Sequence, residues 1–360
     1  MQEFLPLCGA LRAAARRLLP AALTGAFLAA GVGGAHAQKV TDPGTVPADL
    51  VAAAKKEGTV VFYGGTDENT LQEVAEAFQK RYGVKVQFQR LPSGPQRERI
   101  EQEAKAGKTA FDVSQLSDEA WVAEAAGRNM WLKLDPKRMP NLARVPANLQ
   151  NDYYAVGGLV ALTMIYNTKR LAAGDVPKTM EEVLNPKFAG RFAMVGPTTG
   201  LSVRTGYYLL LQKFGQAGYE KYMRDLFALK PRVLASGANG TQQVAAGELD
   251  FVLFASAAFA AEPRAQGAPV AVAYPDPTGI TVRTFQVAAK PLNPNAAQLF
   301  LNWLMSPEGL QLMDGKEQAA PPYGKIPTAL ELPATAKLPK PTDVMKSSDF
   351  ILKNFAAVSK

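Results

Sequence analysis

Residues 59–90 read TVVFYGGTDENTLQEVAEAFQKRYGVKVQFQR, and they predict a strand, a helix and a second strand. The first run is apolar and β-branched, and a glycine-rich turn follows it, in which Thr66 or Asp67 can cap a helix. Apolar residues spaced three and four apart give that helix a buried face until it ends near Tyr82. A β-α-β unit of this kind indicates a parallel sheet and an α/β fold.

Two longer extended stretches, Tyr153–Asn167 and Ile280–Ala289, separate the helices and strands of the chain into two groups. We therefore predict an α/β protein of two lobes joined by two strand crossings, which act as a hinge. Lobe 1 would hold residues 38–152 and about 286–360, with the C-terminal helices partly bracing both lobes. Lobe 2 would hold residues 153–285, including the hinge strands.

A polar loop at residues 196–202, GPTTGLS, follows a short buried strand and precedes a predicted helix. The hydroxyls of Thr198 and Thr199 can cap that helix, and Gly200 would let the backbone come close to a ligand. The free N–H groups and the positive dipole end of the helix favour an anion. Arg204, in the first turn, could add a full charge. An ordinary helix cap is the alternative interpretation.

The first 37 residues are typical of a secretory signal peptide. Three arginines between positions 12 and 17 precede an apolar run at residues 18–32 and an Ala35-His36-Ala37 cleavage site. We expect the mature chain to begin at Gln38 and to reside in the periplasm. A membrane anchor is the alternative, but the apolar run is short for a spanning helix. The pair Arg16-Arg17 leaves both Sec and twin-arginine export open.

Cleavage at this site would remove the only cysteine, Cys8, and the only histidine, His36. The mature protein would then have no thiolate and no imidazole. This excludes Cys–His nucleophiles, Ser–His–Asp triads, thiolate zinc sites and metal sites that contain histidine. Stability must come from the apolar core, because no disulfide can form within the chain.

The charge of the chain favours an anionic ligand or an acidic partner. The 40 basic and 32 acidic residues give a formal net charge of +8. The signal peptide carries three arginines and Glu3, which leaves about +6 on the mature protein. These charges are interspersed, without a basic run or interleaved aromatic residues, so the pattern does not support nucleic-acid binding.

Polar loops follow several of the predicted strands. Ligands of open α/β sheets bind beyond the carboxyl ends of the strands, where helices begin. The loops expected there offer N–H and hydroxyl groups rather than acids and bases. They are Gly64–Asp67, Leu116–Asp118, Gly196–Ser202, Ser236–Thr241 and Ala255–Ala258.

The chain resembles the periplasmic solute-binding proteins of ABC importers, in the branch of the ferric-iron-binding proteins. The resemblance covers nearly all of the mature chain and implies a type II two-lobe fold, hinge closure, delivery of the ligand to an inner-membrane permease, and a monomer. The segments that carry it are TVVFYGGTDENTLQEVAEAFQKRYGVKV (59–86), MIYNTKRL (164–171), NPKFAGRFAMVGPTTG (185–200), QQVAAGELDFVLF (242–254) and NPNAAQLFLNWLMSPEGLQL (293–312).

The iron ligands of that branch do not carry over. Thr66 stands where the relatives have histidine, Ser117 or a neighbour where they have glutamate, and Ala257 and Ala258 where they have two tyrosines. Ferric iron prefers anionic oxygen ligands, which alanine cannot supply. We expect no metal and no cofactor. A rearranged iron site remains an alternative, and it would use the remaining tyrosines, Tyr63, Tyr153, Tyr154, Tyr166, Tyr207 and Tyr208.

The Pro-Thr-Thr-Gly loop does carry over, and in the relatives it holds an anion beside the ligand. We expect this chain to bind a small organic or phosphorylated anion there, with Arg204 and Arg283 as candidate counter-charges. The alternative for Arg283 is a solvated strand residue. The predicted ligand-binding residues are Thr66, Ser117, Thr198, Thr199, Gly200, Arg204, Asn239, Ser256 and Arg283. An Asn-Gly pair is first of all a turn, which weakens the case for Asn239.

Other classes of function have less support in the sequence. A binding protein needs no catalytic group, so we expect no enzymatic activity. A secreted hydrolase with two carboxylates is the enzyme alternative. Its candidate pairs, Asp118-Glu119 and Glu181-Glu182, lie at predicted helix starts, where acids are common. A module that presents ligand to a signalling receptor would use the same two-lobe clamp.

Overall fold

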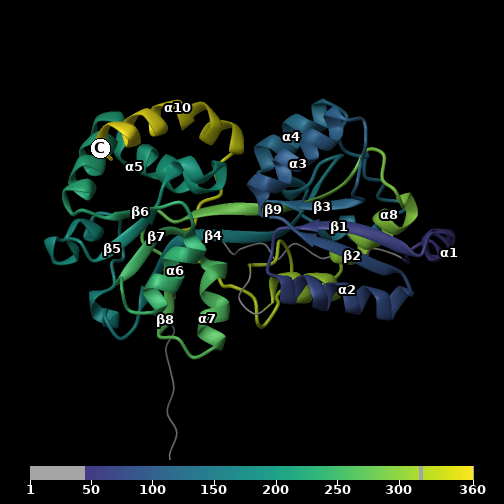
Figure 1. Cartoon of the computed structure of the whole chain (residues 1–360), viewed down its shortest axis with the longest axis horizontal. Helices are drawn as coiled ribbons and strands as arrows, with labels where there is room; N and C mark the ends of the chain where they lie inside the picture. The colour runs from purple at the N-terminus through teal and green to yellow at the C-terminus, as the bar shows by residue number, and fades with distance from the viewer. Residues whose placement is uncertain (1–44, 316–318, 360) are drawn as a thin grey trace, which may run out of the picture. The chain divides into compact units, whose positions relative to one another are not determined.

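One mixed sheet of nine strands organises the described part of the chain, residues 45–315 and 319–359 of a computed structural model (Figure 1). The strands follow the order β2-β1-β3-β9-β4-β7-β5-β6, and β8 pairs with β4. The predicted signal peptide lies outside the described residues. Within them, no helix is both long enough and apolar enough to span a membrane.

The elements have the following bounds. The strands are β1 (Thr59–Gly64), β2 (Lys85–Arg90), β3 (Val113–Leu116), β4 (Ala155–Asn167), β5 (Phe192–Val195), β6 (Arg232–Leu234), β7 (Phe251–Ser256), β8 (Val270–Ala273) and β9 (Gly279–Val287). The α-helices are α1 (Ala48–Glu57), α2 (Glu68–Tyr82), α3 (Ser93–Lys105), α4 (Glu119–Gly127), α5 (Leu201–Ala228), α6 (Gly237–Ala245), α7 (Ala261–Ala265), α8 (Pro294–Leu304), α9 (Pro307–Asp314) and α10 (Pro341–Val358). The 3-10 turns are η1 (Pro140–Arg144), η2 (Ala147–Leu149), η3 (Ala173–Asp175), η4 (Glu182–Leu184), η5 (Pro186–Phe188), η6 (Pro197–Thr199) and η7 (Ala257–Ala260).

The predicted β-α-β unit is present and its strands are parallel. Strand β1 pairs in parallel with β2 along its whole length and with β3 near its end. Helix α2 between them begins at Asp67, whose Oδ1 accepts a hydrogen bond from Thr70 N at 2.9 Å. It ends at Gly83, whose φ of 72° is the left-handed conformation that glycine adopts without strain. Local sequence signals therefore determine both ends of this helix.

The two long predicted crossings correspond to β4 and β9, which pair with each other in antiparallel register. The first half of β4 lies against β9, and the second half pairs with β7 and β8. The register shifts between Val156 and Gly158, which marks a bulge. A Cβ atom on Gly157 would lie 2.5 Å from a ring atom of Phe285, so only glycine fits the inner face at this bulge.

Two separate apolar cores flank this pair of strands. The first core is formed by β1, β3, α1, α2, α8 and α9, with Phe62, Phe78 and Phe300 fully buried at its centre. The second is formed by β5, β7, the predicted crossing β4 and both halves of α5. Helix α10 packs against α5 and contributes Ile351 and Phe355 to the second core (Figure 1). Residues 286–360 were predicted to belong to the first lobe with the C-terminal helices partly bracing both lobes, and α10 packs mainly against α5 and also contacts α4.

Several helices differ from the predicted boundaries for local reasons. The sequence predicts one helix that runs through Phe214 and another from Gly218, and the structure joins them into α5 with a kink at Gly215, whose φ is 67°. The segment after Ser236, predicted as a glycine-rich loop, is instead the first turn of α6. This happens because Ser236 Oγ accepts a hydrogen bond from Asn239 N at 3.2 Å and caps the helix.

Candidate ligand-binding pocket

The loop between β5 and α5 is fixed by hydrogen bonds within itself. Tyr207 donates its hydroxyl proton to Val195 O at 2.7 Å, which ties the second turn of α5 to the end of β5. Thr199 donates both its hydroxyl and its N–H to Gly196 O, at 2.7 and 3.1 Å, so its side chain does not cap α5. Gly200 has φ 164° and ψ 171°, which is extended backbone that any residue adopts.

The start of α5 presents unpaired amides. The first partnered amide of the helix is Arg204 N, which donates to Gly200 O at 3.2 Å. Leu201, Ser202 and Val203 have no acceptor for their N–H groups within the described ranges. Fourteen residues of α5 precede the kink, so its dipole adds a partial positive charge at this end.

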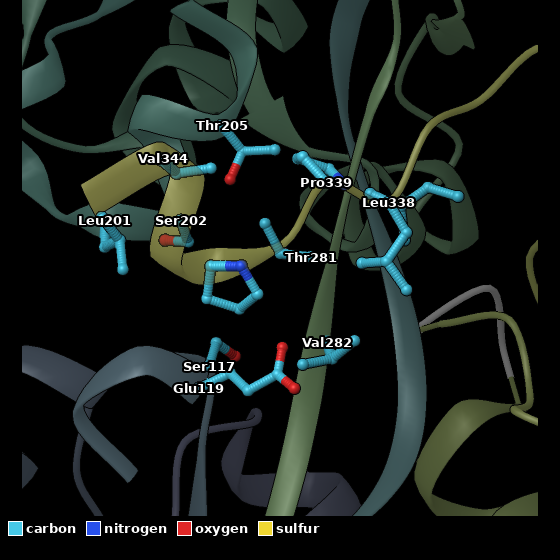
Figure 2. Close-up of a pocket in the computed structure, with 12 residues that line it drawn as sticks. Ser117, Glu119, Leu201, Ser202, Thr205, Thr281, Val282, Leu338, Pro339 and Val344 are labelled. Atoms are coloured by element: carbon cyan, nitrogen blue, oxygen red, sulfur yellow. The ribbon is translucent and has the colours of Figure 1, made fainter. Parts of the chain in front are cut away.

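A pocket that is partly open to solvent lies beside this helix start (Figure 2). Its walls come from the β3–α4 junction, from α5, from β9 and from the segment that leads into α10. The lining residues are Ser117, Glu119, Leu201, Ser202, Thr205, Ile280, Thr281, Val282, Leu338, Pro339, Pro341 and Val344. Four hydroxyl groups and one carboxylate therefore face an otherwise apolar lining.

Glu119 is the only ionisable residue among those lining the pocket. Figure 2 shows its carboxylate pointing into the pocket from the start of α4. Tyr154 donates its hydroxyl proton to Glu119 Oε1 at 2.8 Å. Burial raises the pKa of Glu119, and the hydrogen bond from Tyr154 opposes that rise. Burial also raises the pKa of Tyr154, and the neighbouring Glu119 carboxylate raises it further.

Helix α10 and the segment before it complete the pocket. Val344 of α10 faces the pocket and also belongs to the second core. Arg204 joins this helix to the loop before α5, because its Nε donates to Pro197 O at 3.0 Å and its Nη1 to Ser348 Oγ at 3.3 Å. Burial lowers the pKa of Arg204, while the charges of two nearby aspartates oppose the change. The guanidinium therefore connects two protein segments.

Ser117, alone among the nine predicted ligand-binding residues, lines the pocket. Thr198, Thr199 and Gly200 lie in the loop directly before the lining residues of α5, with both threonines exposed. Arg204 follows Ser202 on the same helix but makes the protein contacts described above.

The other four predicted residues do not line this pocket, namely Thr66, Asn239, Ser256 and Arg283. Thr66 is buried, and its hydroxyl donates to Asp67 Oδ2 at 3.3 Å. Asn239 is exposed in the first turn of α6, where its Oδ1 accepts a hydrogen bond from Gln243 Nε2. Ser256 ends β7, opposite Leu162 of β4.

The structure contradicts both predictions for Arg283, a counter-charge for the ligand and a solvated strand residue. Its exposed fraction is only 4 %, so it is not a solvated strand residue. Its Nη1 donates to Asp314 Oδ1 at 3.0 Å and to Met313 O at 2.9 Å. The guanidinium is therefore paired within the protein, and the expectation of a counter-charge free for the ligand is wrong for this structure.

Glu119, Thr205, Thr281 and the segment from Leu338 to Val344 were not predicted to bind ligand, and Ser202 was predicted only as part of the loop Gly196–Ser202. Glu119 was considered as half of a carboxylate pair for the hydrolase alternative and was interpreted as an acid at a helix start, a position it does occupy. Ser202 and Thr205 stand three apart directly after the anion-favouring loop, and this helical spacing could have identified them. The segment before α10 gave no local signal, because only tertiary packing brings it to the pocket.

The described residues contain no group of three or more acidic, histidine or cysteine side chains placed to hold a metal ion. Of the tyrosines considered for a rearranged iron site, Tyr63 donates to Glu103 Oε1 and Tyr207 to a backbone carbonyl. Tyr154, hydrogen-bonded to Glu119, is the one whose partner lines the pocket.

The family model for bacterial extracellular solute-binding proteins matches residues 64–311. The chain is 25 % identical over 304 residues to the major ferric iron-binding protein of Neisseria gonorrhoeae, covering 82 % of this chain and 90 % of that protein. It is 24 % identical over 267 residues to an uncharacterized protein of Haemophilus influenzae, covering 72 % and 76 % of the two chains.

Solved structures share the fold at low sequence identity. Iron-bound HitA from Pseudomonas aeruginosa superposes with a TM-score of 0.67 at 21 % identity, covering 84 % of this chain and 99 % of that one. AfuA from Actinobacillus pleuropneumoniae, with exogenous fructose-6-phosphate bound, gives 0.66 at 21 %, covering 83 % and 98 %. The substrate-binding protein of an ABC transporter from Agrobacterium tumefaciens gives 0.70 at 16 %, covering 85 % and 96 %.

These matches confirm the predicted resemblance and the predicted type II fold. Members of the family are periplasmic or extracellular binding proteins that deliver ligands to an ABC permease, and both the family and the fold are those of binding proteins rather than enzymes. The chain belongs to the bacterial extracellular solute-binding protein family, in the branch that contains the ferric-iron-binding proteins.

Proposed function

We propose that this chain is the periplasmic binding component of an ABC importer, and that it captures a small organic or phosphorylated solute through an anionic group. The observation that carries the proposal is the composition of the pocket. It joins Ser117, beside the first core, to Ser202 and Thr205 on α5 of the second core, with β9 between them. A ligand in this position would contact both halves of the molecule.

The anionic group of the solute would lie at the first turn of α5. The unpaired amides there and the hydroxyls of Ser202 and Thr205 are hydrogen-bond donors, and the helix dipole adds a favourable field. No lysine or arginine lines the pocket, so the anion would be held by oriented donors rather than by a counter-charge. Thr199 and Gly200 precede these amides and would shape the approach to them.

Capture would involve closure about β4 and β9, because β4 contributes residues to both cores and pairs along its first half with β9 of the first core. A ligand that contacts both sides stabilises the closed state only by its higher affinity for that state. The permease would then recognise the closed surface. We propose that the two predicted lobes are the parts that close on the ligand. Helix α10 would move with the second core, against which it packs.

Ferric iron is the second candidate, since relatives in this branch are iron-binding proteins by name. The oxygen pair of Tyr154 and Glu119 supports it, because hard ferric iron prefers such ligands. Two buried or part-buried alanines, Ala257 and Ala258, argue against it, since they replace the paired tyrosines that the resemblance implies.

A thermal-shift screen tests the proposed function. Ligand-free mature protein would be mixed with organic carboxylates, phosphate esters, phosphonates, polyamines, and ferric iron with citrate or carbonate. At a ligand concentration one hundred times the dissociation constant, binding should add about 2.7 kcal/mol to the free energy of unfolding. We expect a shift with at least one organic anion and none with iron and its carrier anions.

A matched pair of variants connects the shift to the pocket. Ser202→Leu would fill the space beside the first turn of α5 and should abolish the shift. Gln216→Leu, at an exposed position of the same helix, should leave it unchanged. A shift with iron alone would favour the second candidate. An anion-induced shift that survives in Ser202→Leu would contradict the proposed site.

A further inference from the structure

The Glu119 carboxylate has one oxygen in use and one without a partner. Tyr154 holds Oε1 from the protein side, at 2.8 Å. Oε2 has no hydrogen-bond partner in the described part of the chain. Figure 2 shows the carboxylate facing the space between β9 and the start of α5. Its position is therefore fixed by the protein while one of its acceptors faces the pocket.

No basic side chain compensates this carboxylate. Among residues 45–315 and 319–359, Glu119 takes part in no ion pair. The adjacent acid, Asp118, is paired with Arg97 at 3.3 Å. Arg204, the cation nearest along α5, donates to Pro197 O and Ser348 Oγ. A partly buried carboxylate without a cation costs free energy unless a bound group offsets the charge.

The remaining pocket chemistry separates the possible partners of Glu119. Hydroxyl groups of a ligand could already bond to Ser117, Ser202, Thr205 and Thr281, so they do not require an acid. An ammonium group does, because it supplies both the donors and the opposite charge, and such charge-assisted hydrogen bonds are about twice as strong as neutral ones. The apolar lining residues, Leu201, Ile280 and Val282 among them, suit a short aliphatic spacer.

We propose that the solute is a zwitterion, whose ammonium group pairs with Glu119 while its anionic group lies at the first turn of α5. This inference rests on the proposed function and adds the second half of the ligand. The pocket brings Glu119 and the hydroxyl groups of α5 together with apolar lining residues, which suits a short ω-amino acid or an aminoalkyl phosphonate. Glu119 is then the residue that determines specificity.

Matched ligand pairs test the proposal by isothermal titration calorimetry on ligand-free mature protein. One series would compare ω-amino carboxylates of two to six carbons with the corresponding monocarboxylates, such as 4-aminobutanoate with butanoate. A second would compare aminoalkyl phosphonates with alkyl phosphonates. We expect at least one amino compound to bind, and its partner without the amine to bind roughly tenfold to a hundredfold more weakly.

The variant Glu119→Gln isolates the charge, because glutamine keeps the shape and the contact with Tyr154. It should weaken the amino compound by a similar factor and leave the partner compound unchanged, so that the difference between the two disappears. Glu124→Gln is the matched control on the same helix, since that side chain is 61 % exposed and faces Arg128 at 3.7 Å. It should bind as the wild type does. Tyr154→Phe removes the positioning bond and should weaken only the amino compound.

The outcomes distinguish this proposal from the proposed function. Equal binding of amino and non-amino anions, unchanged in Glu119→Gln, would overturn the zwitterion and leave the anion-binding function standing. A thermal shift with polyamines, together with no binding by any compound of the two series, would overturn the placement of an anionic group at α5. Failure of every member of both series to bind, while another organic anion gives a thermal shift, would overturn the zwitterion alone. Failure of all organic anions in both experiments would overturn both proposals.

Discussion

Replacement of Asp314 by alanine is expected to lower the free energy of unfolding by about 3–5 kcal/mol, because it leaves a buried guanidinium without its partner. Arg283 is 4 % exposed on β9, and Asp314 at the end of α9 is fully buried against it at 3.0 Å. Burial raises the pKa of Asp314, and the guanidinium opposes that rise. Equilibrium urea unfolding measures the loss.

Two further variants show whether the cost comes from the unpaired charge. Asp225→Ala breaks an exposed ion pair with Lys221 on α5 and should change stability by less than about 0.5 kcal/mol. The double variant Arg283→Met with Asp314→Leu removes both charges, and it should recover most of the loss because an apolar pair can replace a buried ion pair. A loss of less than about 1 kcal/mol in Asp314→Ala would contradict the buried pairing.

Gly309→Ala is expected to destabilise the protein by about 1–3 kcal/mol, towards the upper end of the range. Gly309 lies in the first turn of α9, just after the sharp turn that separates α8 from α9. A Cβ atom there would lie 2.3 Å from Trp303 O and 2.6 Å from Leu304 Cα. These are backbone atoms of α8, which cannot rotate away as a side chain could, so the two helices would have to separate.

Gly94→Ala provides the matched control for Gly309→Ala. Gly94 also lies in the first turn of a helix, α3, but nothing stands within 4 Å of the added Cβ. Alanine there should be neutral or should stabilise by about 0.4–1 kcal/mol, because it reduces the entropy of the unfolded chain. Equal effects of the two substitutions would show that the contact between α8 and α9 is not the reason for glycine in the Ser-Pro-Glu-Gly segment.

Much of the fold could be predicted because its signals are local. The β-α-β unit at residues 59–90 follows from a cap at Asp67, an apolar helical face and a stop at Gly83. The two long strands also follow from their own composition. Tertiary packing determined the features that were missed. No local sequence pattern indicates that α10 packs into the second core, beside α5.

The candidate site was less predictable, since a pocket is a property of distant segments. The loop at residues 196–202 and Ser117 were identified from strand ends, and the pocket does lie beside them. Arg283 was predicted to be free to pair with the ligand. Its ion pair with Asp314, thirty-one positions later in the chain, depends on tertiary packing and leaves no local pattern in the sequence. Glu119 was set aside because acids at helix starts are common, and the sequence does not reveal that this one faces a cavity.

The packing of α10 sets an order in which the chain can complete its structure. Among the described residues, the buried members of the first core lie between Leu50 and Met313, and only the partly buried Tyr323 and Ile326 follow them. The second core lacks Val344, Ile351 and Phe355 until the far end of the chain arrives. Since polypeptides are synthesised from the N-terminus, the half that carries α5 keeps part of its apolar surface uncovered until residues 341–358 have been made.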